Sequence, residues 1–281
     1  MMLTHKRLCT PVVFESALTL DTSATFDSNA NKVVIAYKDN GNSNYGTAIV
    51  GTVSGTNISF GSAAVFESAA SAYISATFDS NANKVVIAYQ DGGNSDYGTS
   101  IVGTVSGTNI SFGTAVVFES ATAKFSAITF DSNSNKVVIA YRDDGNSKYG
   151  TAIVGTVSGT GISFGTAVVF ESARTDIPSP VFDSNANKVV ISYVDEPNSN
   201  YGTIIAGTVS GTSISFDAPI VFEAANTTEI SSTFVASVGK VLVAYKDIAN
   251  SNKGSSVVFQ SGYTNITRAE VASGSTAVID I

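Results

Sequence analysis

FDSNANKVVIAYKDNGNSNYGTAIVGTVSGTNISFGSAAVFES, residues 26–68, returns in recognisable form along nearly the whole chain. The phenylalanine of its VFES ending repeats every 52 residues, and so do its first phenylalanine and the tyrosine of VVIAY. The three series are Phe14, Phe66, Phe118, Phe170 and Phe222; Phe26, Phe78, Phe130, Phe182 and Phe234; and Tyr37, Tyr89, Tyr141, Tyr193 and Tyr245. A period this constant indicates tandem duplication of one structural unit.

Each unit is predicted to contain four β-strands, which we name A to D. In the first unit they are SATFD, KVVIAYKD, YGTAIVGTV and ISFGSAAVFES. Val, Ile, Thr, Tyr and Phe fill these segments, whereas Asn, Gly, Ser and Asp cluster between them. Four antiparallel strands in about 50 residues favour a propeller blade, because a single blade cannot bury both of its faces and a ring of blades can. An open β-solenoid and a string of small sandwiches are the alternatives.

We therefore predict an all-β fold, a five-bladed β-propeller spanning residues 1–262, followed by a C-terminal extension, residues 263–281. The repeats start near residues 17, 69, 121, 173 and 225.

The first residues of the chain supply a spare D strand. Residues 6–16 align with strand D of every unit, with Phe14 opposite Phe66. The other candidate, from Ile266 onward, fits badly, since Arg268 and Gly274 stand where the units carry phenylalanine. A buried charge and a void at those places would be costly. We expect the N-terminal strand, residues 6–16, to complete the last blade and close the ring.

Divergence among the five copies indicates a binding face. The A-to-B and C-to-D turns are nearly constant, whereas the D-to-A and B-to-C connections vary. Because strand direction alternates, the two variable connections emerge on the same face. The candidate ligand-binding residues are Asp21, Tyr73, Phe125, Ile177 and Glu229 in the D-to-A connection, and Lys38, Gln90, Arg142 and Lys246 near the B-to-C connection. Aromatic residues at such places are typical of sugar or protein binding, and local packing is the alternative for Tyr73 and Phe125.

Composition argues against several classes of function. The net charge is −8 with no basic cluster, so a nucleic-acid partner is not expected. No apolar stretch approaches the length of a membrane span, and the N-terminus lacks the apolar core of a secretory signal. The single cysteine, Cys9, and the single histidine, His5, support neither a disulfide framework, a Cys-based zinc site nor a Ser-His-Asp triad. We expect no cofactor, no metal and no enzymatic activity.

A glycosidase is the weakest alternative. Aspartates recur at the end of strand A, at Asp27, Asp79, Asp131 and Asp183. Glycosidases need carboxyl groups in different environments, one protonated and one ionised, whereas near-identical repeats give near-identical environments. We interpret these aspartates as turn formers.

The run of residues 26–68 resembles a repeat in predicted tail or fibre-like proteins of marine bacteriophages, and the resemblance covers residues 11 to about 259. It implies a virion surface or adhesion role without naming a ligand. Our leading hypothesis is a non-enzymatic binding propeller, a virion or tail component that recognises a host surface glycan or protein and contacts other virion proteins. Its expected place is the virion or extracellular surface, reached without a signal peptide. A lectin-like module of cellular origin and a purely structural repeat are the alternatives.

Overall fold

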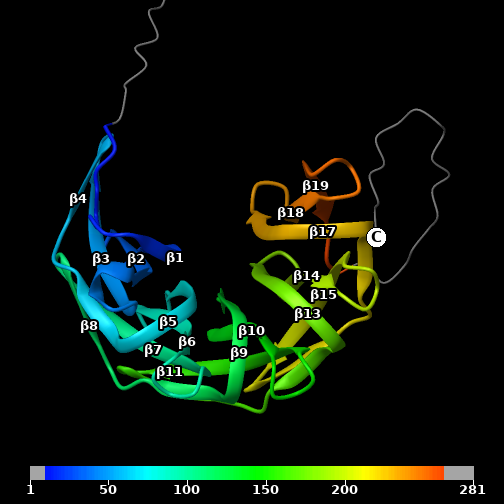
Figure 1. Cartoon of the computed structure of the whole chain (residues 1–281), viewed down its shortest axis with the longest axis horizontal. Helices are drawn as coiled ribbons and strands as arrows, with labels where there is room; N and C mark the ends of the chain where they lie inside the picture. The colour runs from blue at the N-terminus through cyan, green and yellow to red at the C-terminus, as the bar shows by residue number, and fades with distance from the viewer. Residues whose placement is uncertain (1–9, 263–281) are drawn as a thin grey trace, which may run out of the picture.

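The computed structural model describes residues 10–262, which fold almost entirely into antiparallel β-sheet (Figure 1). The predicted B and C strands are confirmed. The B strands are β2 (Lys32–Asp39), β6 (Lys84–Asp91), β10 (Lys136–Asp143), β14 (Lys188–Asp195) and β18 (Lys240–Asp247). The C strands are β3 (Tyr45–Ser54), β7 (Tyr97–Ser106), β11 (Tyr149–Ser158), β15 (Tyr201–Ser210) and β19 (Lys253–Phe259).

Short strands form hairpins with the first four C strands. They are β4 (Asn57–Phe60), β8 (Asn109–Phe112), β12 (Gly161–Phe164) and β16 (Ser213–Phe216). A single turn of 3-10 helix, η1 (Asn40–Asn42), follows β2. In the described part of the chain no helix is long and apolar enough to cross a membrane.

Strand D of one unit and strand A of the next form one continuous strand. These strands are β5 (Ala64–Asp79), β9 (Val116–Asp131), β13 (Val168–Asp183) and β17 (Ile220–Val235), and β1 (Thr19–Asp27) is the first A strand. The first half of β5 pairs with β3, and its second half pairs with β6. The prediction of a loop between strands D and A was therefore wrong. A strand shared in this way holds two consecutive sheets against each other without a flexible connection.

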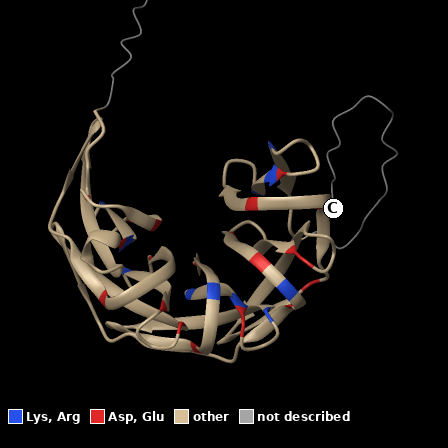
Figure 2. Cartoon of the chain, viewed as in Figure 1, with Lys and Arg blue, Asp and Glu red and all other residues tan. Residues whose placement is uncertain are grey.

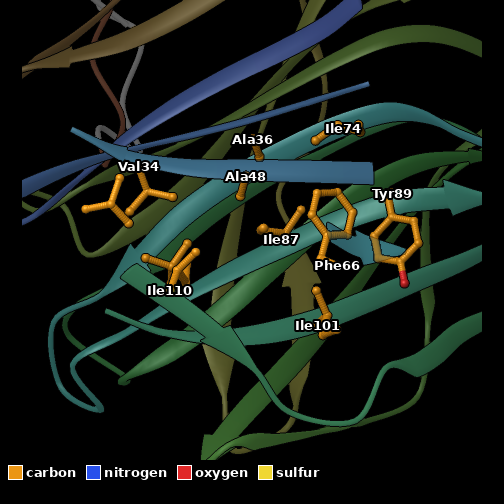
Figure 3. Close-up of a cluster of buried hydrophobic side chains, with 11 residues drawn as sticks. Val34, Ala36, Ala48, Phe66, Ile74, Ile87, Tyr89, Ile101 and Ile110 are labelled. Carbon is orange, nitrogen blue, oxygen red and sulfur yellow. The ribbon is translucent and has the colours of Figure 1, made fainter. Parts of the chain in front are cut away.

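The core lies between consecutive sheets. Figure 3 shows one such interface, where Val34 and Ala36 of the first unit face Phe66, Ile87 and Tyr89. All five side chains are buried. B strands such as KVVIAY are apolar on both faces, so each inner sheet packs on both sides, as the continuous apolar run predicts.

The strand-end aspartates are turn formers, as predicted. Asp79 is 1% exposed, and its Oδ1 accepts the backbone N–H groups of Asn81 and Ala82 at 2.9 and 2.8 Å. The same pair of bonds forms at Asp27, Asp131 and Asp183.

The five sheets form an open arc, with β1 near one end and β17 to β19 at the other (Figure 1). Residues 10–17 pack on the first sheet as an unpaired segment, with the Phe14 ring 5.2 Å from Tyr37 and 5.8 Å from Phe60. Phe66 packs in the same way on the second sheet. Within residues 10–262 no strand pairing joins this segment to β19, so the expected closure is not seen. The ends of the arc do not meet, and pairing requires that they do. Residues 6–9 and the extension, residues 263–281, lie outside the described residues.

Candidate functional site

We call the strand-A parts of β1, β5, β9, β13 and β17 the inner strands. A β-bulge interrupts each of them at the same place, and the D-to-A candidates sit in it. The pairing of β5 with β6, for example, shifts register between Ala72 and Ser75. The residues there adopt positive φ: Asp21 (47°), Tyr73 (51°), Phe125 (54°), Ile177 (52°) and Glu229 (53°). Side chains other than glycine disfavour this region, most strongly when β-branched. All five predicted positions are thus strained bulge residues of a strand rather than members of a loop.

The B-strand candidates stand opposite the residue that precedes each bulge. Gln90 pairs with Ala72, and Arg142 pairs with Lys124. Lys38 and Lys246 occupy the same position in the first and fifth units. The D-to-A candidates and the B-strand candidates are therefore neighbours across one strand pair. This agrees with the expectation that both groups lie on the same face.

Three of the predicted residues, Tyr73, Phe125 and Arg142, are in contact between the second and third units, and a fourth, Gln90, bonds to the backbone there. We call these four residues the aromatic–arginine cluster. The rings of Tyr73 and Phe125, from β5 and β9, lie 4.9 Å apart. The guanidinium carbon of Arg142 lies 4.9 Å from the centroid of the Phe125 ring. Gln90 Nε2 donates to the carbonyl oxygen of Ala123 at 3.1 Å, which links the second unit to the third.

Arg142 is held by two carboxylates although only 6% of it is exposed. Its Nε donates to Asp144 Oδ1 at 2.7 Å, and its Nη1 bonds to Asp176 of the fourth unit. Burial alone would lower the pKa of Arg142, but both carboxylates together raise it. Burial alone would raise the pKa of Asp144, but Arg142 and Lys124 hold it below the ordinary value. The guanidinium therefore stays charged and fixed beside the aromatic pair.

Further ion pairs extend the network on both sides of Arg142, and basic and acidic side chains alternate along it. Lys124 Nζ lies 3.2 Å from Asp144, and Arg174 bonds to Asp176 at 3.2 Å and to Glu196 at 2.9 Å. Figure 2 shows acidic and basic colours next to each other on β13, and a basic segment on the neighbouring β9. With Arg142 included, three cations meet three carboxylates, so the network is balanced in charge.

Sequence comparison of the repeats missed Arg174 as a site residue. The only available signal is that it is the sole charged residue of its column, where the other units carry Leu18, Ala70, Thr122 and Asn226.

The remaining predicted residues are not brought into the cluster. Asp21 and Lys38 belong to the first unit, and Glu229 and Lys246 belong to the fifth, at opposite ends of the arc (Figure 1). Ile177 occupies the bulge of the fourth unit. The structure thus supports one differentiated cluster in the second to fourth units rather than five equal sites.

A series of pairs between half-buried glutamates and buried tyrosines joins the sheets, and sequence reasoning did not identify it. Each VFES-type glutamate accepts a hydrogen bond from the tyrosine hydroxyl of the next sheet; the pairs are Glu15–Tyr37 (3.4 Å), Glu67–Tyr89 (3.0 Å), Glu119–Tyr141 (2.9 Å), Glu171–Tyr193 (3.0 Å) and Glu223–Tyr245 (2.9 Å). Burial raises the pKa of all five tyrosines, that of Tyr245 to about 12. The signal was the constant 52-residue spacing of both members.

Among the described residues, no group of three or more His, Cys, Asp or Glu side chains is placed to hold a metal ion.

No protein-family model matches the chain, and no curated protein matches it. Several solved structures share its fold. The SapL1 lectin, in complex with α-methyl fucoside, is 14% identical, with 87% of this chain and 77% of that chain covered and a TM-score of 0.56. AofleA from Arthrobotrys oligospora is 11% identical over 89% of this chain and 72% of that chain, with a TM-score of 0.55.

An intramolecular trans-sialidase from Ruminococcus gnavus is also similar, at 11% identity over 89% of this chain and 79% of that chain, with a TM-score of 0.57. At such identities the likeness shows the fold alone, which is all-β and propeller-like. Proteins with this fold include both a lectin and a glycan-processing enzyme, so function must be argued from the site.

Proposed function

We propose that this chain is a non-enzymatic, lectin-like carbohydrate-binding protein whose ligand contacts the aromatic–arginine cluster. The observation that carries this is the ring pair of Tyr73 and Phe125, held in strained backbone beside a fixed arginine. Aromatic faces pack against the C–H faces of sugars, and a few placed polar groups orient the hydroxyls. Strained conformations that persist in a fold cluster at functional sites.

The scaffold we propose for this function is a five-bladed propeller closed by its N-terminal strand. The shared strands and the repeated intersheet cores support five equivalent blades. Closure would place the second to fourth units, which carry the aromatic–arginine cluster and its ion pairs, on one side of a ring.

The glutamate–tyrosine pairs argue against catalysis of the sialidase kind, in which a tyrosine is the nucleophile. A nucleophile is activated by a lowered pKa or by an adjacent base. Glu67 and Glu119 do lie beside Tyr89 and Tyr141 as bases, but both tyrosine side chains are completely buried, so a substrate cannot reach their hydroxyls, and burial raises their pKa. Near the cluster, Asp144 and Asp176 are engaged by arginine, which leaves neither of them poised as a proton donor.

The biological setting stays a prediction. The repeat resemblance supports a virion or extracellular surface, with a host glycan as the ligand and other virion proteins as neighbours. A lectin of cellular origin would use the same cluster, so binding experiments test the function in either setting. Mass spectrometry of purified phage particles tests the virion setting.

The decisive experiment is a glycan array with the full chain and the double variant Tyr73→Ala/Phe125→Ala. Loss of both rings should weaken glycan binding at least about tenfold while thermal stability changes little. The double variant Asn57→Ala/Asn109→Ala, in two exposed C-to-D turns, is the control and should bind normally. Binding that survives loss of the rings but fails in the control would overturn the proposal.

A further inference from the structure

A hollow lies at the other end of the inner strands from the aromatic–arginine cluster. Its volume is about 420 Å³, within the range of small-molecule sites. It is lined by Thr25, Phe26, Thr77, Phe78, Thr129, Phe130, Ser132, Val181, Phe182 and Ser184. Eight of these are the same two neighbouring positions in four consecutive units. We call it the Thr–Phe hollow.

The Thr–Phe hollow is separate from the aromatic–arginine cluster. Tyr73 and Phe78 are five residues apart on one extended strand, which corresponds to roughly 16 Å. The hollow lies beside the A-to-B turns, where divergence among the repeats gave no reason to expect a site.

The lining carries no charged side chain. The nearby aspartates that end the inner strands, such as Asp79 and Asp131, are at most 2% exposed and accept turn N–H groups. A charged ligand would lose its hydration here without meeting an opposite charge, which is unfavourable. The chemistry of the hollow therefore selects for a neutral ligand.

Phenylalanine and threonine residues line the hollow together. Phe26 is 54% exposed, and Phe78 and Phe130 are half-buried. The half-buried threonines Thr25, Thr77 and Thr129 stand next to them in the sequence and also line the hollow. Such a surface matches a ligand with one apolar face and a rim of hydroxyl groups.

We propose that the Thr–Phe hollow is a second binding site, for a neutral saccharide of one or two rings. The phenylalanine rings contact its C–H face, and the threonine hydroxyls bind its hydroxyl groups. This inference rests on the lining of the hollow and not on the aromatic–arginine cluster. A chain with sugar sites at both ends of its inner strands can bridge two glycans.

The chain offers its own conservative variant for the test. Val181 occupies in the fourth unit the position of Thr77 and Thr129, so valine is accommodated there. The double variant Thr77→Val/Thr129→Val removes two hydroxyls while keeping the shape. The reverse change, Val181→Thr, adds one. Thr56→Val, on an exposed C-to-D turn, is the matched control.

The experiment is an NMR titration of the full chain with lactose and with α-methyl fucoside, and with 3′-sialyllactose as a charged counterpart of lactose. We expect shifts at the hollow with a neutral sugar, about tenfold weaker binding in Thr77→Val/Thr129→Val, and tighter binding in Val181→Thr. The control should match the wild type, and 3′-sialyllactose should bind the hollow more weakly than lactose.

The two sites fail independently. NMR shifts report each site separately. Shifts at the hollow that are as strong in Thr77→Val/Thr129→Val as in the wild type would overturn the second site and leave the proposed function standing. Shifts at the aromatic–arginine cluster that are unchanged in Tyr73→Ala/Phe125→Ala would overturn the cluster and leave the hollow standing. No shift at the hollow with either neutral sugar would also overturn this inference.

Discussion

Tyr73, Phe125 and Ile177 show how strain is maintained at single residues. Each sits at positive φ, which costs on the order of 1–3 kcal/mol for a side chain other than glycine. The strand pairing on both sides of the bulge fixes the backbone, so the residue cannot relax without breaking the ladder. Random drift would favour glycine or asparagine at such a place, yet the five copies carry neither. The same backbone conformation occurs with five different side chains, so the pairing around the bulge, and not one particular side chain, maintains the strain.

The half-buried glutamates that bind the tyrosine hydroxyls give the fold a pH dependence. Burial raises the pKa of Glu67, Glu119 and Glu171, although hydrogen bonds from the tyrosines lower it in part. The folded state therefore binds these protons more tightly than the unfolded chain. Its free energy of unfolding should rise as the pH falls from the raised pKa toward the ordinary glutamate pKa of about 4.3.

Calorimetry between pH 7 and 5 tests this, and the melting temperature should increase on acidification. Replacing the three glutamates by glutamine should flatten the increase, because glutamine does not bind a proton in this pH range. Glutamine still accepts the tyrosine hydrogen bond, so the fold should be kept. Asp144 acts in the opposite direction, because its lowered pKa contributes stability that is lost only as the pH falls below about 3.9. A melting temperature that falls steadily from pH 7 to 5 would contradict the prediction.

Serine side chains link consecutive inner strands. Ser23 Oγ accepts the N–H of Ala76, Ser75 Oγ that of Ile128, and Ser179 Oγ that of Ser232. At the remaining interface the serine is replaced by Ala127, and the following strand carries Pro180, which has no N–H group. Acceptor and donor are missing together, so no backbone group is left unpaired there.

Ser75→Ala should therefore be costly, because it leaves the N–H of Ile128 without its partner. We expect a loss of about 1–3 kcal/mol in the free energy of unfolding by urea denaturation. Ala127→Ser is the matched control and should give no gain, since Pro180 cannot donate. Equal effects of the two changes would show that the serine bond has no role.

At the two open ends of the arc, the first and last described segments carry the residues that pair with each other inside the arc. In the inner units a C strand pairs with a D strand, for example Thr47 with Val65. The 52-residue period makes Ser255 and Val13 the equivalent pair at the open ends. Leu242, Ala244 and Val258 of the fifth unit correspond to Val34, Ala36 and Val50, which are completely buried, whereas Val258 is 50% exposed. The proposed closure would cover this face.

An engineered disulfide tests closure directly. Paired residues of antiparallel strands have Cα atoms about 4.5–5.5 Å apart, which suits a disulfide. With Cys9 replaced by serine, Val13→Cys/Ser255→Cys should oxidise within one chain and raise the melting temperature. Covalent dimers instead of a cross-linked monomer would show that the ends join between two copies.

Glycine substitutions give an independent readout of the same contact. A Cβ added at Gly46 would lie 2.3 Å from the Phe66 ring, whereas at Gly254 nothing lies within 4 Å. On closure, Phe14 would stand on Gly254 as Phe66 stands on Gly46. Gly254→Ala should then lower the melting temperature as Gly46→Ala does, and a neutral Gly254→Ala would mean that the arc stays open in solution.

The sequence by itself determined the repeat, the bounds of the B and C strands, the turn role of Asp79 and its equivalents, and the columns that hold Tyr73, Phe125, Gln90 and Arg142. These follow from local chemistry and from a fixed period, because period-2 patterning and turn residues act over a few positions. Only the tertiary structure decided that strands D and A are continuous, that Tyr73 and Phe125 are strained bulge residues in contact, and that Arg142 is held by Asp176 from the next unit. These contacts join residues 34 to 52 positions apart, and their geometry depends on how the sheets pack, which no local pattern encodes.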